Sequence, residues 1–401
     1  MSVREIPGGI TAASGFLASG VAAGIKASGA LDITLIVAGR EASAAAVFTT
    51  NQVQAAPVVL SRRHIESSGG RLRAVIVNSG CANACTGAQG MAAAQATVDA
   101  VAALVGCPPD QVLVCSTGVI GVDLPVEKVI AGAAAAHASL GRDGDAAARG
   151  IMTTDVAPKQ HAVEVTTAAG TFRAGGIAKG AGMIEPNMAT MLAFVTTDAA
   201  VAPALLDRAV REVADRTFNA ITVDGDSSTN DTFAVLASGE SGVAIDESSY
   251  GDFVAGLEAV ARALALAIVR GGEGATKLVA VRVTGAASAA DAKKAAKTIA
   301  NSLLVKTAIH GADPNWGRLV AAAGRSGAAF VLDRARVEVG PLVLFSDGQP
   351  FDDQAPAAAR YLRQPELDLH VDMGTGGGGE AVVWTCDLSA EYVRINGEYR
   401  T

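Results

Sequence analysis

The sequence has no cluster of basic side chains and no long hydrophobic run. Its 401 residues include 32 Lys and Arg against 40 Asp and Glu, for a net charge of −8. No segment gathers Lys and Arg on one face, so the positive surface that nucleic-acid binding requires is missing. The longest apolar run, residues 257–269, is too short to span a membrane and contains Arg262. The N-terminal segment lacks the apolar core of a secretion signal, so we expect a cytoplasmic enzyme.

Cysteine is scarce, at five residues, and the number is odd. A secreted protein built on disulfides would carry more cysteines in an even number, so the composition favours a reducing cytoplasm. Cys81 and Cys85 are four residues apart, but no second Cys or His pair follows at the spacing of a zinc site. We predict buried structural thiols, with no metal and no cofactor.

The Gly-rich and acidic segments also lack the endings of known ligand loops. GTGGGGE (374–380) and GGIAKGAG (175–182) have no Lys-Ser or Lys-Thr to complete a phosphate loop. We predict that 374–380 is the tip of a hairpin. VDGDSSTND (223–231) has no glutamate to close a twelve-residue calcium loop. Its Asp and Asn residues are expected to order loops near the functional site.

Hydrophobic periodicity predicts an α/β protein. Half of the residues are hydrophobic, which suffices for a large core and two packed units. Apolar β-rich runs alternate with segments of helical period, which is typical of α/β layering. We predict a layered α/β sandwich with mixed sheets plus a second, smaller α/β domain. The expected strands are 73–77, 111–115, 191–197 and 276–285, with a hairpin across 168–170, and the expected helices are 91–106, 204–217, 288–304 and 314–324.

The pattern of predicted strands and helices changes after Gly271–Gly272, where we place a domain boundary. The main catalytic domain is predicted to comprise residues 1–270, and the smaller domain residues 271–345. The tail, residues 346–401, is expected to return to the main domain.

A threonine stands where a Gly-rich loop enters a predicted strand, in KGAGMIEPNMATML (179–192). A threonine hydroxyl is a poor nucleophile until a base takes its proton, and an N-terminal threonine can use its own α-amine. That amine has a pKa of roughly 7.7–8.0, so part of it is unprotonated near neutrality. Thr190 would gain such an amine only if the bond after Ala189 were cut. The residues alone favour a simpler interpretation, a β-branched residue at the start of a strand.

The pattern around Thr190 resembles that of the ornithine acetyltransferases (glutamate N-acetyltransferases). The resemblance runs in order along nearly the whole chain, which makes coincidence a poor explanation. The matching segments are GFLASGVAAGIK (15–26), AAVFTTNQVQAAPV (45–58), VNSGCANACTG (77–87), STGVIG (116–121), MTTD (152–155), TVDGDSSTNDT (222–232), GGEGATK (271–277), VKTAIHGADPNWGR (305–318) and CDLSAEYVRINGEYRT (386–401).

The resemblance implies a chain that cuts itself and then transfers acetyl groups. Thr190 would attack the carbonyl of Ala189, and hydrolysis would leave an α-chain (1–189) and a β-chain (190–401) that assemble as an α₂β₂ heterotetramer. Thr190 would then take the acetyl group of N-acetylornithine and pass it to glutamate, in a ping-pong reaction of arginine biosynthesis. Some family members also use acetyl-CoA or serve other acyl transfers, and the sequence leaves this open.

The resemblance also assigns an oxyanion pair and a substrate-binding lysine. Thr117 and Gly118 match the family's oxyanion pair, and small residues there let N–H and hydroxyl groups approach closely. Without the resemblance, this segment would be a strand-to-helix turn. Lys179 matches a lysine suited to holding an amino-acid carboxylate. A cation near Thr190 would also disfavour protonation of its α-amine.

Further substrate contacts are implied elsewhere in the chain. In MTTD the family's substrate-binding threonine aligns with Thr153 or Thr154, although both could instead make local turn bonds. Glu273 matches a substrate-binding glutamate that could face the δ-ammonium of ornithine. Asn396 and Thr401 match a pair at the end of the family's closing motif, although chain termini usually fray.

Two alternatives remain at the level of the sequence. A threonine-nucleophile amidohydrolase or aminopeptidase would use water as the acceptor, and would release acetate instead of forming acetylglutamate. A non-enzymatic α/β binding protein would keep the fold without cleaving itself. The intact Ala189–Thr190 motif argues against this second alternative.

Overall fold

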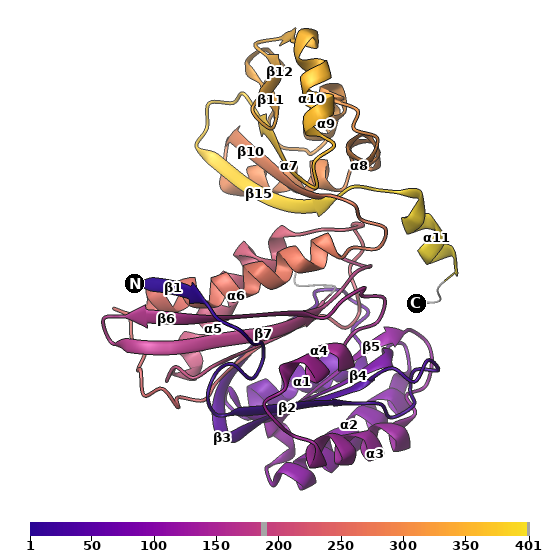
Figure 1. Ribbon diagram of the computed structural model, residues 1–401, viewed down its shortest axis with the longest axis vertical. Coiled ribbons are helices and arrows are strands. Elements are labelled where there is room, and N and C mark those ends of the chain that lie inside the picture. The colour runs from indigo at the N-terminus through magenta and orange to yellow at the C-terminus, as the bar shows by residue number, and fades with distance from the viewer. Residues whose placement is uncertain (186–190, 399–401) are drawn as a thin grey trace. The chain divides into compact units, whose positions relative to one another are not determined.

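The computed structural model describes residues 1–185 and 191–398 and divides into two compact units. The first unit comprises residues 1–219 and 226–268, and the second comprises residues 220–225 together with those described from 269 onward. Each unit has its own sheet, its own helices and its own core (Figure 1). Within the described residues, no helix is long and apolar enough to cross a membrane.

Within the described residues, the first unit contains one nine-stranded mixed sheet. Its order is β1-β6-β7-β8-β9-β3-β4-β5, with β2 paired to β3. The pairs β4–β5 and β8–β9 are parallel, and the other pairs are antiparallel. The strands are β1 (Ser2–Glu5), β2 (Phe16–Val21), β3 (Ile33–Phe48), β4 (Arg71–Cys81), β5 (Val112–Val119), β6 (Lys159–Thr167), β7 (Gly170–Lys179), β8 (Leu192–Thr197) and β9 (Thr232–Ala237).

Strand β3 connects the two halves of this sheet. Its pairing with β4 runs from Ile33 to Ser43 with an irregularity after Val37, and Ser43 to Phe48 pair with β9. Apolar side chains from both halves, among them Ile36 and Phe194, share one buried cluster. One continuous strand thereby carries the chain from the β4–β5 half to the β7–β9 half.

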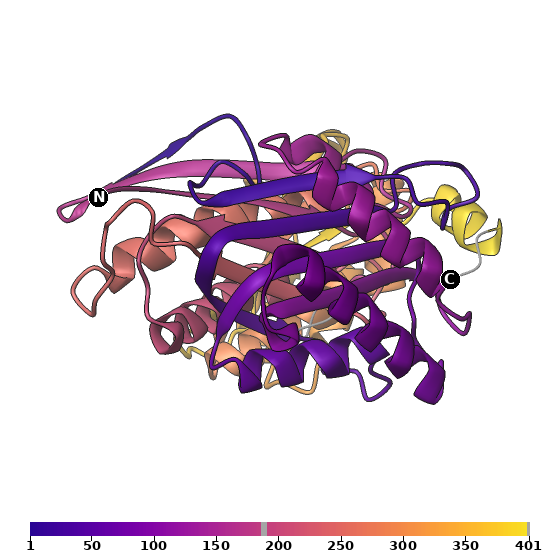
Figure 2. The ribbon, with the colours of Figure 1, turned by 90° about the horizontal axis from the view of Figure 1, so that it is seen from below.

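Helices cover the faces of the sheet wherever apolar residues recur with helical spacing. Helices α1 (Ala56–Ser67), α2 (Gly87–Val105) and α3 (Val126–Ala138) pack on the half that contains β3, β4 and β5 (Figure 2). The buried positions of α2 include Ala94, Val98 and Val101, which lie on one helical face. A 3₁₀ helix, Pro109–Gln111, leads into β5.

The described part of the first unit contains three more α-helices. They are α4 (Gly144–Gly150), α5 (Pro203–Arg216) and α6 (Tyr250–Arg270). A Cβ atom on Gly20 would lie 1.9 Å from the carbonyl oxygen of Ala146, so α4 approaches β2 as closely as only glycine permits. Helix α6 packs on β7, with the rings of Phe172 and Phe253 5.9 Å apart. A second 3₁₀ helix, Phe218–Ala220, follows α5.

The ends of three strands meet in one row of the sheet. Lys179, the last residue of β7, pairs with Leu192, the first residue of β8, and Leu192 pairs with Thr232, the first of β9. All six residues of β8 are buried, as expected for an apolar strand covered on both faces. The row therefore places Lys179 and Thr232 on either side of a fully buried strand.

Within the described residues, the second unit is built on a six-stranded mixed sheet of order β13-β12-β11-β14-β10-β15. Its valines Val279, Val281 and Val283 alternate along β10 and pack against the alanine-rich face of α7. Two 3₁₀ helices, Leu332–Arg334 and Asp352–Gln354, lie in its loops. The regular elements are β10 (Leu278–Ala286), α7 (Ala289–Ala300), α8 (Leu303–His310), α9 (Trp316–Gly324), β11 (Arg336–Val339), β12 (Leu342–Ser346), β13 (Gln349–Pro350), α10 (Ala355–Tyr361), β14 (Glu366–Asp372), β15 (Gly379–Cys386) and α11 (Ala390–Glu398).

The predicted α/β class with mixed sheets is confirmed, and three expectations are corrected. The described part of the tail 346–401 belongs to the second unit, because β14 and β15 pair with β10 on its two sides. The segment 374–380 is therefore no hairpin tip, since β10 lies between the two strands that it connects. The helix expected over 288–304 is two helices, because Ser302 accepts a hydrogen bond from the Val305 N–H and caps a new start.

Candidate active site

The end of β5 carries the first two predicted site residues in a constrained backbone. Thr117 is 9% exposed, and Gly118 has a φ of +131°, a conformation that disfavours side chains. A Cβ atom on Gly118 would lie 2.3 Å from the carbonyl carbon of Gly80 in the neighbouring strand. The packing of β5 on β4 thus requires glycine at this position.

Lys179 brings the end of β7 to the same place. Its Nζ donates a hydrogen bond to the Thr117 Oγ1 over 3.3 Å, between residues 62 positions apart in the chain. Both side chains are buried. A buried ammonium requires compensating charge or hydrogen bonds, so its surroundings must supply them.

Asp155 supplies negative charge to these surroundings and is paired with a second buried lysine. Its carboxylate is paired with the ammonium of Lys159, accepts the Gly180 N–H at 2.8 Å, and accepts the Thr153 N–H at 3.1 Å. Burial alone would raise the pKa of Asp155, but the charges of Lys179 and Lys159 and these bonds hold it below its ordinary value. Asp155 is therefore an anion that fixes the turn after Lys179.

A third lysine, on the β2–β3 loop, lies near enough for its charge to interact with this cluster. Burial lowers the pKa of Lys26, and so does the charge of Lys179, while Asp32 and Asp155 act in the opposite direction. The Lys26 Nζ donates to the carbonyl of Leu31 at 2.7 Å. The Asp32 carboxylate accepts three loop amides, at 2.6 to 3.0 Å. This loop holds a cation near the predicted site.

A carboxyl group lies buried at the start of β9. Asp231 is 3% exposed, and its Oδ2 has no hydrogen-bond partner among the described residues. Burial raises the pKa of this carboxyl well above its ordinary value, against the opposing charge of Lys179. The group is held close to the row formed by the ends of β7, β8 and β9.

The remaining predicted residues of the first unit lie at or beside this cluster. Thr153 and Thr154 are half-buried, and the backbone N–H of Thr153 binds Asp155 as a local turn bond. This bond is compatible with either threonine contacting a substrate. Ala189 and Thr190 lie outside the described residues.

The second unit brings together its own pair of predicted residues. Glu273 lies in the turn after α6 and is 7% exposed, and its Oε2 accepts a hydrogen bond from the Asn396 Nδ2 at 2.7 Å. The Ser389 hydroxyl donates to the Gly274 carbonyl at 2.6 Å, which holds the start of α11 against this turn. The amide of Asn396 therefore orients the carboxylate of Glu273. Thr401 lies outside the described residues.

Sequence reasoning gave no role to Lys26, Asp155 and Lys159 of the first unit, and it expected Asp231 only to order a loop near the site. Lys26, Lys159 and Asp231 are at or next to segments whose pattern indicates a buried strand or a Gly-rich loop, which is an unusual place for a charge, whereas Asp155 has no such signal. That signal could have singled out the other three. It could not have shown which of them meet, because pairing between distant strands is set by the sheet.

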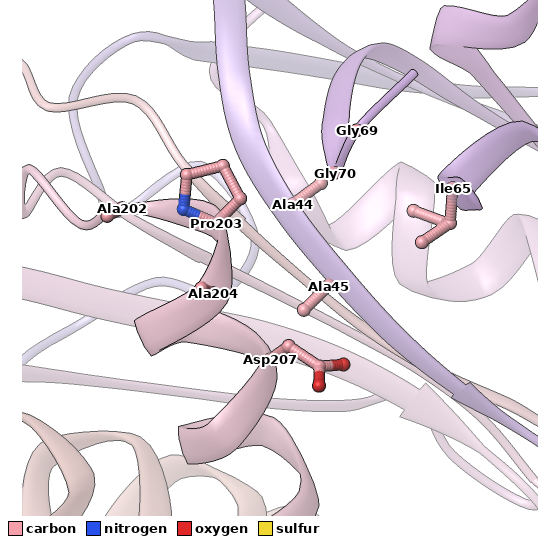
Figure 3. Close-up of a pocket in the computed structure, with 9 residues that line it drawn as sticks. All are labelled: Ala44, Ala45, Ile65, Gly69, Gly70, Ala202, Pro203, Ala204 and Asp207. Atoms are coloured by element: carbon pink, nitrogen blue, oxygen red, sulfur yellow. The ribbon is translucent and has the colours of Figure 1, made fainter. Parts of the chain in front are cut away.

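The other candidate features lack comparable chemistry. Burial raises the pKa of the Cys115 thiol to about 12, which suits an inert core residue. Among the described residues, no group of three or more His, Cys, Asp or Glu side chains is placed to hold a metal ion. The open pocket in Figure 3, between β3 and α5, is lined mainly by small apolar residues, with Asp207 the charged one among the described residues that line it.

Comparison with known proteins identifies relatives over the full length. The ArgJ family matches residues 17–401. An arginine biosynthesis bifunctional protein ArgJ from Symbiobacterium thermophilum is 50% identical over 402 residues, which cover 99% of each chain. A solved arginine biosynthesis bifunctional protein argJ from Bacillus halodurans is 41% identical with a TM-score of 0.50, and the match covers 98% of that chain and 51% of this one. Ornithine acetyltransferase from Mycobacterium tuberculosis, solved in complex with ornithine, is 47% identical with a TM-score of 0.43, over 99% of its chain and 46% of this one.

Proposed function

Because the chain belongs to the ArgJ family, we propose that it moves an acetyl group from N-acetylornithine to glutamate through an acetyl-enzyme. Family membership makes it an acetyltransferase of arginine biosynthesis. The donor, the acceptor and the two-step course are the proposal. Acetyl-CoA as a second donor would make the enzyme bifunctional, in keeping with the names of its relatives.

Thr190 is the proposed nucleophile, first on its own chain and then on substrate. Its hydroxyl attacks the carbonyl of Ala189, and hydrolysis of the resulting ester leaves chains 1–189 and 190–401. The new α-amine of Thr190 then serves as the base for acetyl transfer. One length relationship supports the cut: nearly the whole solved chain from Bacillus halodurans, 98%, corresponds to only 51% of this chain. We propose that the two pieces stay together and pair into an α₂β₂ assembly.

Thr117 and Gly118 are the proposed donors to the oxyanion that forms in each step. A tetrahedral intermediate places negative charge on the former carbonyl oxygen, and fixed donors in a dry site stabilise it. The constrained backbone of Gly118 and the burial of Thr117 support this role, since donors that cannot move cost no reorganisation. Loss of one such donor typically lowers the rate by about 10²–10³.

Lys179 is the proposed ligand of the substrate carboxylate. Glutamate and N-acetylornithine both carry an α-carboxylate, so one cation can position the donor and the acceptor in turn. Its ammonium is buried beside Thr117, where an ion pair is weakly screened. The Asp155–Lys159 pair keeps the turn after Lys179 in place.

Glu273 is the proposed partner of the δ-ammonium of ornithine, with Asn396 holding its carboxylate in position. Thr401, and one of Thr153 and Thr154, complete the proposed set of substrate contacts. This set comes from the family resemblance. The hydrogen bond between Asn396 and Glu273 supports it, because it joins two residues that the resemblance assigns separately.

The observation that carries the proposal is the hydrogen bond between Lys179 and Thr117. It joins a residue proposed to bind substrate with one proposed to stabilise the intermediate, 62 positions away. The test is the intact mass of the denatured protein beside its Thr190→Ala variant, followed by acetyl-transfer assays. We expect two wild-type fragments that meet between Ala189 and Thr190, a whole variant chain, and acetylglutamate as the product.

The same assays separate the alternatives. Acetate released without acetylglutamate would identify a hydrolase. A wild-type chain that stays uncut and is inert toward N-acetylornithine would exclude Thr190 as a nucleophile. Acetylglutamate formed from acetyl-CoA and glutamate alone would establish the second donor.

A further inference from the structure

Asp231 combines deep burial with an unused hydrogen-bonding atom. Its Oδ2 has no hydrogen-bond partner among the described residues, although the side chain is almost completely removed from solvent. A buried polar atom usually has a partner, because leaving it without one is costly. The first unit nevertheless leaves the Asp231 Oδ2 without a partner, which indicates a function for this atom beyond packing.

The position of Asp231 is fixed by bonds on both sides. The Thr49 N–H donates to the Asp231 carbonyl at 3.1 Å, and the Thr232 N–H donates to the Met191 carbonyl at 3.0 Å. The preceding Asn230 donates from Nδ2 to the Ala82 carbonyl at 2.6 Å and to the Ser116 carbonyl at 2.9 Å. These bonds tie the start of β9 to Met191 on one side and to the residue before Thr117 on the other.

The surroundings of the carboxyl include Met191, the residue that follows the proposed nucleophile in the sequence. The Met191 N–H and the Thr49 hydroxyl interact with it, and Lys179 is the charged group whose field reaches it. The carboxyl therefore lies beside the backbone N–H of Met191, the residue that follows the proposed nucleophile in the chain.

The cleavage step needs a proton carrier that the later acetyl transfer does not need. Before cleavage, the nitrogen of Thr190 is an amide and cannot act as a base. A lysine ammonium has only donors to offer. A neutral carboxyl group can give a proton and take one back, as general acid–base catalysis requires.

We propose that Asp231 carries the proton of the chain-cleavage step, an inference that rests on the proposed function. The Thr190 Oγ forms a bond to the Ala189 carbonyl carbon while the bond from that carbon to the Thr190 nitrogen breaks. Asp231 gives its proton to the departing nitrogen and takes the proton of the Thr190 hydroxyl, so it ends neutral as it began. Water then hydrolyses the ester, which leaves the carboxyl end of chain 1–189 and the free hydroxyl of Thr190.

The first test is the rate of self-cleavage in newly translated precursor, followed on denaturing gels. Asp231→Asn keeps the shape of the side chain but cannot exchange the proton, so we expect cleavage to slow by about 100-fold or more. The matched control is Asp198→Asn, at the opposite end of β8. Asp198 is also buried, but both its oxygens are bonded, to the Arg173 N–H at 2.7 Å and the Ser14 N–H at 3.1 Å. This control is expected to cleave at nearly the wild-type rate.

The outcomes separate this inference from the function on which it rests. If the wild type cleaves, Thr190→Ala does not, and Asp231→Asn cleaves as fast as the wild type, Asp231 carries no proton and the acetyltransferase proposal is untouched. If the wild-type chain stays whole, both proposals fail together.

A second measurement tests whether the buried carboxyl keeps its proton in the folded chain, which a proton carrier requires. Thr190→Ala and Thr190→Ala/Asp231→Asn are compared by melting temperature, so that both chains are whole. Burial raises the pKa of Asp231, so the folded chain keeps a proton that the unfolded chain loses above about pH 4. The carboxyl therefore destabilises the fold increasingly as pH rises, and the Asn variant should melt higher by a margin that grows with pH. A lower melting temperature at every pH would indicate a packing role and overturn the inference.

Discussion

The Lys179 ammonium donates a hydrogen bond to the Thr117 hydroxyl across 3.3 Å, and both groups are buried. The end of β7 and the end of β5 therefore meet as one polar site inside the first unit. The bond makes the two side chains interdependent, because removing either one leaves the other without this partner.

Thr117→Ala should lower kcat for acetyl transfer by about 10²–10³ with a smaller change in KM, because a donor to the oxyanion acts mainly in the transition state. The measurement is steady-state formation of acetylglutamate, normalised to the cleaved fraction of the enzyme. Thr117→Ser keeps the hydroxyl and is the control. An alanine variant with unchanged kcat would remove Thr117 from the chemistry.

Lys179→Met should raise KM for both glutamate and N-acetylornithine by about 10–100-fold, since a hydrogen bond to a charged group contributes about 1.5–3 kcal/mol. A comparable rise for the two substrates is expected because both carry the carboxylate that Lys179 is proposed to hold. Lys128→Met, which removes an exposed ammonium on α3, is the matched control. A rise confined to one substrate would contradict a shared carboxylate site.

Asp155→Asn should lower the free energy of unfolding by about 3 kcal/mol near neutral pH, because it breaks the buried ion pair with Lys159 and removes a negative charge that acts on Lys179. Burial opposes the shift, but the two lysines hold the pKa of Asp155 below its ordinary value. Its stabilising effect is therefore present above the unfolded pKa of about 3.9 and is lost as pH falls through the folded pKa.

Urea unfolding in the Thr190→Ala background measures this difference without interference from cleavage. The gap in unfolding free energy between the chain that keeps Asp155 and the Asp155→Asn chain should stay constant from about pH 6 to 8 and shrink below about pH 4. A gap that widens in acid would mean that Asp155 is protonated in the folded chain.

Glu273→Gln should raise KM for N-acetylornithine by about 10–100-fold, because the carboxylate proposed to face the δ-ammonium becomes neutral. The Gln side chain can still accept the hydrogen bond of Asn396, so the turn after α6 should be retained. The control is Glu391→Gln, an exposed glutamate of α11 that pairs with Arg394. An unchanged KM with an intact fold would exclude Glu273 from substrate binding.

Local patterns predicted the elements better than their assembly. The apolar run 191–197 and the periodic segment 204–217 correspond to β8 and α5. Their apolar residues recur with the spacing that burial of one or both faces of an element requires. The segment 374–380 was mispredicted as a hairpin tip. Nothing in its residues shows that β10, about 90 positions earlier, lies between the strands that it joins.

The sequence alone determined the α/β class, most of the strands and helices, and the candidate residues from Thr117 to Asn396, because these depend on local spacing and on motifs that keep their order. Only the tertiary structure decided that Asp155 pairs with Lys159 and lies within the field of Lys179, that Lys179 bonds to Thr117, and that one oxygen of Asp231 has no partner among the described residues. The physical reason is that a buried charge is stabilised by whatever lies beside it in space. Which groups lie there is set by the pairing of strands far apart in the chain.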